Sequence, residues 1–172
     1  MSTQFPSSQD LILGVEIGGT KLQLAIGEPG EAPLALHRGQ ANAERGAVGI
    51  LQWFEQEIQP FLERASVARP AAIGVGFGGP VESATGRSLV SHQVQGWEDI
   101  ALKQWFEERF DAPTLVANDS NAAGWGEYCR GAGHGTRNFF YSNIGSGIGG
   151  ALIIDGKLHD GQGFGAGEVG HA

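Results

Sequence analysis

The sequence predicts a mixed α/β fold, in which an antiparallel N-terminal meander continues into parallel strands that are connected by helices. Three observations support this prediction. Apolar runs of strand length come first, and amphipathic stretches of helix length then alternate with further strands. The 29 glycines, where average usage would give about 12, cluster beside these apolar runs and are not spread as in a linker. The 172 residues are enough for one compact domain, with room for a rudimentary second.

The first part of the chain predicts three strands and a long helix. The runs LILGVEI (11–17) and LQLAI (22–26) are typical of strands, and a looser strand follows at 34–38. A helix is expected over 45–66, because apolar residues recur there at spacings of three and four: Ile50, Leu51, Phe54, Ile58, Phe61 and Leu62. Pro60 lies inside this pattern, so we expect a kink or an early end of the helix.

The second part alternates strands with shorter helices. The run AAIGVGF (71–77) predicts a strand, and residues 97–110 predict an amphipathic helix. The segment TLVA (114–117) has the length and flanks of a buried strand, and a helix of small residues follows over about 119–130. The last periodic segment, NFFYSNIGSGIGGALIID (138–155), predicts two strands around a Gly-Ser-Gly turn.

Composition narrows the class of protein. The formal charge of −8 disfavours an extended nucleic-acid interface and favours small or neutral partners. The single cysteine, Cys129, excludes an internal disulfide framework within this chain. Residues 1–10 lack the apolar segment of a signal peptide, and no apolar run approaches the ~20 residues that cross a bilayer. We therefore expect no membrane partner and a cytoplasmic location.

The segment LGVEIGGTKLQLAIG has two interpretations. Gly18 and Gly19 fit a tight hairpin turn, where glycine readily adopts positive φ. Thr20 and Lys21 then remain unexplained. A hydroxyl and an ammonium that follow exposed backbone N–H groups are also what a phosphate-binding corner requires. These residues alone leave both interpretations open. We call residues 18–21 the first glycine corner, and the similar residues 145–147 the second glycine corner.

The segment VANDSNAAGWGE follows the strand predicted at 114–117. Asn118 and Asp119 therefore lie at the carboxyl end of a strand, where α/β sheets place ligand crevices, and also at a helix N-terminus. Asp119 or Ser120 could simply cap the helix. Alternatively, Asp119 is a general base that accepts a proton from a substrate hydroxyl, with Asn118 orienting a neighbouring hydroxyl. The two roles are compatible.

Two other glycine-rich segments allow both a structural and a functional interpretation. GVGFGGPVE (74–82) could be a tight turn that ends at Pro80, or a wall without side chains against which a polyhydroxylated ligand lies. GEVGH (167–171) places Glu168 and His171 three residues apart, which brings them to one face if the segment is helical. They could equally be a solvated loop carboxylate and a surface histidine.

The combination of these motifs resembles the ROK family, which contains bacterial sugar kinases of the glucokinase and fructokinase types and sugar-responsive repressors. The motifs occur in family order from residue 11 to residue 171: GVEIGGTK, GVGFGGPVE, GW at 96–97 opening a helix, NDSNAAGWGE, IGSGIGGALIIDG and GEVGH. The resemblance implies the actin/hexokinase-like (ribonuclease H-like) ATPase fold. It also implies a kinase that transfers the γ-phosphate of ATP to a hexose hydroxyl, most readily that of glucose.

The resemblance also implies roles for individual residues. Asp119 would deprotonate the attacking hydroxyl. The sugar would be bound by Gly79, Asn118, Glu168 and His171. The phosphates would be approached by Gly18, Gly19, Thr20 and Lys21, helped by Gly145, Ser146 and Gly147. These assignments favour a phosphate-binding role for the first glycine corner.

Two metal ions are implied by the same family pattern. Glu16 would direct Mg²⁺, through water, beside the ATP phosphates. His171 would be a zinc ligand, completed in the family by three cysteines that follow downstream of it. Cys129 lies too early in the chain to be one of them. Structural zinc is therefore expected only in a full-length protein.

The resemblance divides the chain into residues 1–10 as a tail, 11–160 as an N-terminal ATPase lobe, and 161–172 as the start of a sugar-binding segment that leads into a missing C-terminal lobe. We expect the full-length protein to be a homodimer, and the 172-residue chain alone to turn over little or no substrate. Two alternatives remain. One is a sugar-sensing repressor, in which a winged-helix segment would precede the first glycine corner. The other is a sugar-binding lobe without catalysis.

Overall fold

The computed structural model describes residues 11–90, 94–145, 147–159 and 167. Its main sheet contains β1 (Ile12–Ile17), β2 (Lys21–Gly27), β3 (Ala35–Gln40), β4 (Ala72–Phe77) and β7 (Thr114–Asn118), in the order β3-β2-β1-β4-β7. The pairs β1–β2 and β2–β3 are antiparallel, whereas β1–β4 and β4–β7 are parallel. The predicted meander and parallel crossovers are therefore confirmed.

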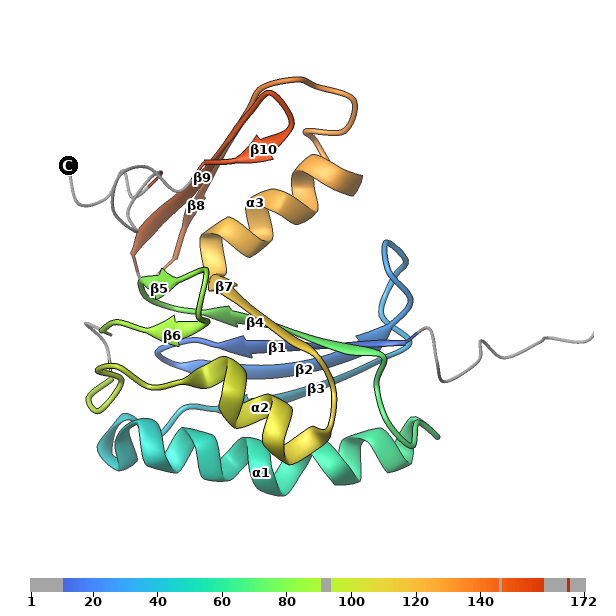
Figure 1. Cartoon of the computed structure of the whole chain (residues 1–172), viewed down its shortest axis with the longest axis vertical. Helices are drawn as coiled ribbons and strands as arrows, with labels where there is room; N and C mark the ends of the chain where they lie inside the picture. Colours follow the sequence, from blue (N-terminus) through green and yellow to red (C-terminus); the bar gives the residue numbers. More distant parts are fainter. Residues whose placement is uncertain (1–10, 91–93, 146, 160–166, 168–172) are drawn as a thin grey trace, which may run out of the picture.

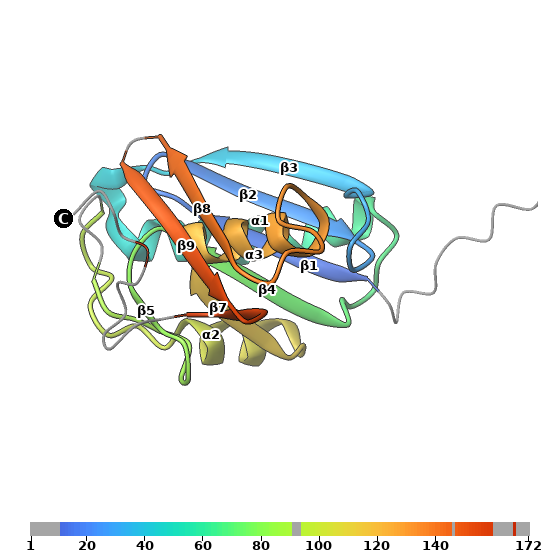
Figure 2. The same ribbon diagram turned by 90° about the horizontal axis from the view of Figure 1, so that it is seen from above.

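A second sheet, which sequence order did not separate from the first, is formed by β8 (Phe139–Ile144), β9 (Ile148–Ile154) and β10 (Lys157–Leu158). Helix α3 (Asp119–Arg130) lies between the two sheets, while α1 (Gly46–Arg64) and α2 (Leu102–Phe110) cover the opposite face of the main sheet (Figure 1). A short hairpin of β5 (Val81–Glu82) and β6 (Arg87–Ser88) follows β4. Viewed from above, α3 crosses the main sheet beneath β8 and β9 (Figure 2).

The core lies between the main sheet and α1 and α2. Alternate residues of β1, β2 and β4 are buried on this face, and Phe54 of α1 meets Phe106 of α2 with ring centroids 6.0 Å apart. All the predicted apolar positions of α1 are buried except Leu51, which is half-buried. On the other face of the main sheet, smaller or polar residues such as Gly14, Glu16 and Gly74 line a cleft.

Of the two effects expected at Pro60, a kink or an early end, the early end is wrong, because α1 continues to Arg64. A proline inside a helix cannot donate to the carbonyl four residues earlier, here that of Gln56. Both Pro60 and Gln56 lie on the exposed side of α1, so water can satisfy that carbonyl. The helix tolerates the proline for this reason.

The second helix begins later than the predicted 97–110, and the pair at 96–97 does not open it. Trp97 is instead a core residue, 1% exposed, with its ring 5.0 Å from that of Phe77. Asp99 has a φ of 58°, which is incompatible with a continuous right-handed helix, so α2 starts only at Leu102. The strand at 114–117 was expected to be buried, but β7 is an edge strand and Leu115 is 69% exposed.

Among the described residues, no helix is both long and apolar enough to span a membrane. The predicted tail (1–10) and most of the segment 161–172 lie outside the described residues.

Candidate active site

Asp119 is the first residue of α3 and directly follows β7. Its Oδ1 accepts hydrogen bonds from the backbone N–H of Ser120 at 2.7 Å and from the Ser120 hydroxyl at 3.3 Å. Burial raises the pKa of the Asp119 carboxyl above its ordinary value, although the hydrogen bonds from Ser120 act in the opposite direction. A carboxylate with a raised pKa is a better proton acceptor, which is the property that a general base needs.

The N-cap of α3 is Asn118, so the interpretation of Asp119 or Ser120 as the cap is wrong. Its Oδ1 accepts from the backbone N–H of Asn121 at 3.0 Å, and its Nδ2 donates to the Gly79 carbonyl at 3.2 Å. The amide therefore fixes the start of α3 and ties it to the loop after β4. Because Asn118 takes the capping role, the carboxylate of Asp119 is not needed for it.

Replacing Asn118 by Ala should destabilise the fold. The change removes the cap and the bond to Gly79, and loss of an Asn cap typically costs about 0.5–2 kcal/mol. Thermal unfolding of the 172-residue chain measures the effect. As a control, Asn118→Asp keeps a capping oxygen and loses only the amide donor, so it should lose less stability than Asn118→Ala. Equal losses would show that the cap contributes nothing.

Gly78 and Gly79 bring the loop after β4 against both Asp119 and the first glycine corner. A Cβ on Gly78 would lie 3.5 Å from Asp119 Oδ2 and 3.6 Å from the Cα of Gly18. A Cβ on Gly79 would lie 2.6 Å from the Val90 carbonyl and 2.9 Å from the Phe77 ring. These contacts are made within the protein, so close packing of the loop accounts for the glycine at position 79, and the wall that faces a ligand stays a prediction.

The first glycine corner joins the antiparallel strands β1 and β2, so the predicted hairpin turn is confirmed. Gly18 N donates to the Lys21 carbonyl at 3.0 Å, and Lys21 Nζ lies 3.3 Å from Glu16 Oε1. Positive φ is not the reason for these glycines: seven described glycines have it, and neither Gly18 nor Gly19 is among them. Gly18 is required by space, because a Cβ there would lie 2.9 Å from the Lys21 carbonyl oxygen.

The second glycine corner joins β8 to β9. Gly145 N donates to the Gly147 carbonyl at 2.8 Å, and Cβ atoms on these two glycines would meet nothing within 4 Å. Ser146 lies outside the described residues. The β8–β9 connection is at the same end of the molecule as the β1–β2 connection in both overall views (Figures 1 and 2). Both corners are thus at one end of the molecule.

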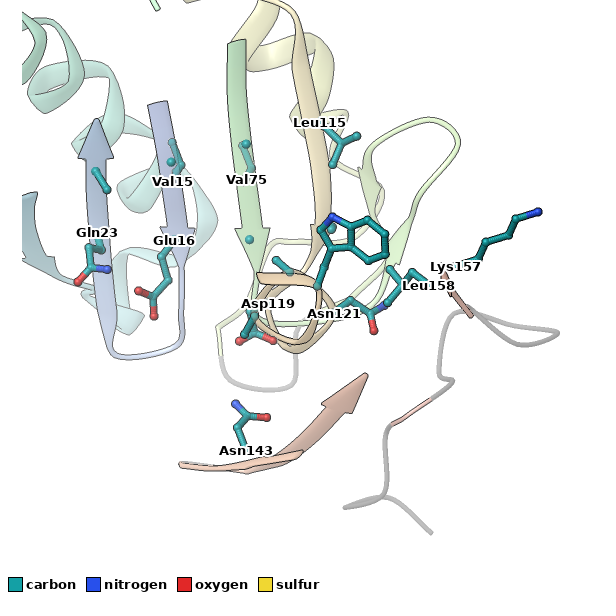
Figure 3. Close-up of a pocket in the computed structure, with 18 of the residues that line it drawn as sticks. Val15, Glu16, Gln23, Val75, Leu115, Asp119, Asn121, Asn143, Lys157 and Leu158 are labelled. Atoms are coloured by element: carbon teal, nitrogen blue, oxygen red, sulfur yellow. The ribbon is translucent and has the colours of Figure 1, made fainter. Parts of the chain in front are cut away.

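A cleft of about 890 Å³ lies between the open face of the main sheet, α3 and the second sheet. Its polar lining comes from Glu16 and Gln23 on the main sheet, Asp119 and Asn121 on α3, Asn143 on β8 and Lys157 on β10. Figure 3 shows the carboxylate of Asp119 between Glu16 and the amide of Asn143. Among the described residues, no group of three or more His, Cys, Asp or Glu side chains could hold a metal ion.

The structure therefore brings several of the predicted residues together. Asp119 lies beside Gly78, Gly78 packs against Gly18, and Asn118 holds Gly79. Glu168 and His171, the two other predicted sugar-binding residues, lie outside the described residues, and His171 is also the predicted zinc ligand.

Sequence reasoning missed Ser120, Asn121 and Asn143 as residues of the site. Ser120 is 4% exposed, and its hydroxyl reaches both Asp119 and Asn143. The buried Oδ1 of Asn121 has no hydrogen-bond partner among the described residues. The only signal in the sequence was that Ser120 and Asn121 directly follow Asp119. No pattern in the neighbouring sequence linked Ser120 or Asn121 to Asn143.

The family model for the ROK family matches residues 12–172. The glucokinase of Halalkalibacterium halodurans is 32% identical over 162 residues, covering 92% of this chain and 48% of that protein. The xylose repressor of Bacillus spizizenii is 32% identical over 114 residues, covering 66% of this chain and 30% of that protein. The chain thus spans about half the length of the glucokinase that it matches, which agrees with an N-terminal lobe.

Among solved structures, the ROK family glucokinase from Streptomyces griseus in complex with glucose and AMPPNP is similar, with a TM-score of 0.82 and 33% identity. The match covers 94% of this chain and 50% of that chain. A TM-score of this size over nearly the whole chain shows that both share one fold, the actin/hexokinase-like fold of ROK hexokinases.

Proposed function

Since the chain belongs to the ROK family, we propose that it is the base-carrying N-terminal lobe of an ATP-dependent hexose kinase, with glucose as the leading acceptor. One observation carries this proposal. Asp119, a carboxylate with a raised pKa, lines a cleft and lies beside the glycine loop that packs against the first glycine corner. The similarity to glucokinases supports the same choice of substrate.

In the proposed reaction, a hexose hydroxyl oxygen attacks the γ-phosphorus of ATP as its proton passes to Asp119. The bond between the γ-phosphorus and the bridging oxygen breaks, and ADP leaves with that electron pair. Phosphoryl transfer depends mainly on in-line positioning of the reactants and on stabilisation of charge. One correctly positioned base and exposed backbone amides can supply both. Asp119 then returns its proton to solvent.

The two substrates would occupy different parts of the site. Asn118 and Gly79 would bind the sugar, together with Glu168 and His171. Asn118 can still do so, since its Nδ2 carries a second N–H besides the one bonded to Gly79. The phosphates would lie against Gly18, Gly19, Thr20 and Lys21, and against Gly145, Ser146 and Gly147.

In this proposal, Mg²⁺ would lie in the cleft and would be bound chiefly by the nucleotide. Glu16 and Asp119 line one cleft, but no larger group of ligands is present among the described residues, so direct binding by the protein alone is not supported. Glu16 would hold the ion through water. When bound, Mg²⁺ neutralises charge on the phosphates. Lys21, paired with Glu16 at 3.3 Å, would keep that carboxylate oriented.

A sugar-sensing repressor is the second candidate, because a xylose repressor is among the relatives. The kinase is favoured by the Asp119 environment, since a repressor has no need of a half-buried base. A sugar-binding lobe without turnover is the third candidate. We further propose that the full-length kinase is a cytoplasmic homodimer that acts on neither nucleic acid nor membranes, and that zinc at His171 occurs only in it.

The full-length product should phosphorylate a hexose in a coupled assay with ATP and Mg²⁺. The assay panel is glucose, fructose, mannose, N-acetylmannosamine and N-acetylglucosamine, and glucose should give the highest kcat/KM. A parallel titration of the 172-residue chain with the same sugars should detect binding without turnover. Binding by the full-length product without phosphorylation of any sugar would contradict the kinase proposal and support the repressor or binding lobe.

A further inference from the structure

The Ser120 hydroxyl connects the two sheets at the position of the proposed base. Ser120 is the second residue of α3 and is 4% exposed. Its Oγ lies 3.3 Å from Asp119 Oδ1 and 3.1 Å from Asn143 Oδ1. Asn143 belongs to β8 of the second sheet, and Figure 3 shows its amide facing Asp119 across the cleft. One buried hydroxyl therefore lies within hydrogen-bonding distance of the carboxylate and of a residue of another layer.

Space for this bridge is provided by Gly149. This residue of β9 pairs with Asn143 across the sheet, and a Cβ there would collide with the Ser120 hydroxyl and lie 2.8 Å from Asn143 Oδ1. The contact between α3 and the second sheet is thus close enough to hold the hydroxyl in place. A hydroxyl has one proton to donate, so Asp119 and Asn143 compete for it.

We propose that Ser120 is a positioning residue, whose hydroxyl holds Asp119 and Asn143 in a fixed relation across the cleft. Both bonds from Ser120 go to Oδ1 of Asp119, which leaves Oδ2, the oxygen nearer Gly78, to receive the proton of the acceptor hydroxyl. Asn143 lies two residues before Gly145, so the same hydroxyl sets the distance between the base and the second glycine corner. This inference rests on the proposed kinase function.

The orientation of Asn143 follows from the same bridge. Its Oδ1 accepts from Ser120, so its Nδ2 is turned away from that bond. This Nδ2 has no hydrogen-bond partner among the described residues, and Asn143 lines the cleft. A fixed amide donor at this position can contact an anion that lies between the two glycine corners. Ser120 would therefore orient a base on one wall and a donor on the other.

The variant Ser120→Ala removes the hydroxyl and keeps the backbone donor. The carboxylate of Asp119 loses a hydrogen bond that favours its charged form, so its pKa should rise. Carbon-detected NMR titration of the 172-residue chain measures this, with the Asp119 signal assigned by comparison with Asp119→Asn. In the full-length kinase, kcat should fall about tenfold because Asp119 is no longer held in one orientation toward the acceptor hydroxyl, and hexose KM should change little.

The variant Asn143→Ala should move the same pKa in the opposite direction. Without the competing acceptor, the Ser120 proton is donated to Asp119 alone, which stabilises the carboxylate and lowers its pKa. Ser142→Ala is the matched control, since Ser142 is the exposed neighbour of Asn143 on the other face of β8. It should leave both the pKa of Asp119 and the kinetics unchanged.

The outcomes separate this inference from the proposed function. If Ser120→Ala folds and leaves the pKa of Asp119 unchanged, or only lowers the unfolding temperature, the positioning role is overturned. If Ser120→Ala does not fold, the shift in Asn143→Ala decides: a lowered pKa supports the bridge, and an unchanged one overturns it. If the wild-type kinase phosphorylates no hexose but both pKa shifts occur, the bridge stands as a structural link and the kinase proposal fails.

Discussion

Replacing Asp119 by Asn is expected to lower kcat for hexose phosphorylation by a factor of about 10²–10⁴, the usual contribution of a positioned general base. The change keeps the shape of the side chain, and an oxygen that can accept from Ser120 remains. The hexose KM should therefore change little, because the lost interaction matters in the transition state and not in ground-state binding. Steady-state kinetics of the full-length product with ATP and Mg²⁺ measure both quantities.

The same variant should be at least as stable as the wild type at pH 7. Burial raises the folded-state pKa of Asp119, so the folded state holds its proton more tightly than the unfolded chain does. Stability from this group is then fully present below the unfolded pKa, near 3.8, and is lost as pH rises through the folded pKa. Asn carries no charge and avoids this loss. Thermal unfolding at pH 7 separates lost catalysis from lost folding.

The pH profile gives a second test of the base. Only the ionised carboxylate can accept a proton, so the acidic limb of kcat/KM should lie above 3.8 in the wild type and should vanish in Asp119→Asn. Asp111→Asn is a suitable control. Asp111 is an exposed residue at the C-terminus of α2, its φ of 48° suits Asn equally well, and it lies outside the cleft. Normal kcat in Asp119→Asn would refute the assignment of the base.

Periodic segments of the chain were predicted well because their patterns are local. The apolar positions of α1 follow a spacing of three to four and are buried as expected. The same holds for β1 and β2, whose alternating burial leaves Glu16 on the cleft side. Exceptions occurred where tertiary contacts override the pattern: Trp97 was counted as the start of a helix, yet its ring is needed in the core against Phe77.

Very short elements and long-range contacts could not be predicted. The strands β5, β6 and β10 have two residues each, too few to show any periodicity. Nor does a strand pattern state which sheet a strand joins, so the separation of β8 and β9 from the main sheet was not foreseen. For the same reason Asp119 and Asn118 were found from their place after a strand, whereas the bridge from Ser120 to Asn143, 23 residues apart, was not.

Gly79→Ala is the second substitution for which we expect a large effect, and Gly74→Ala is its matched control. Gly74 lies in β4, and Gly79 is the second residue after its end. A Cβ on Gly79 would lie 2.6 Å from the Val90 carbonyl oxygen, so backbone must move, whereas a Cβ on Gly74 would meet nothing within 4 Å. Such overpacking typically costs about 1–3 kcal/mol. Gly74→Ala should be neutral or slightly stabilising, because alanine restricts the unfolded chain.

The consequence of Gly79→Ala should extend to the sugar site. The Gly79 carbonyl accepts from Asn118 Nδ2 at 3.2 Å, so a displaced loop also releases the amide that would bind the sugar. We expect the unfolding temperature to fall by roughly 2–4 °C for each kcal/mol lost, together with weaker hexose binding by the 172-residue chain in a calorimetric titration. If Gly79→Ala unfolds at the same temperature as Gly74→Ala, the loop is not closely packed around Gly79.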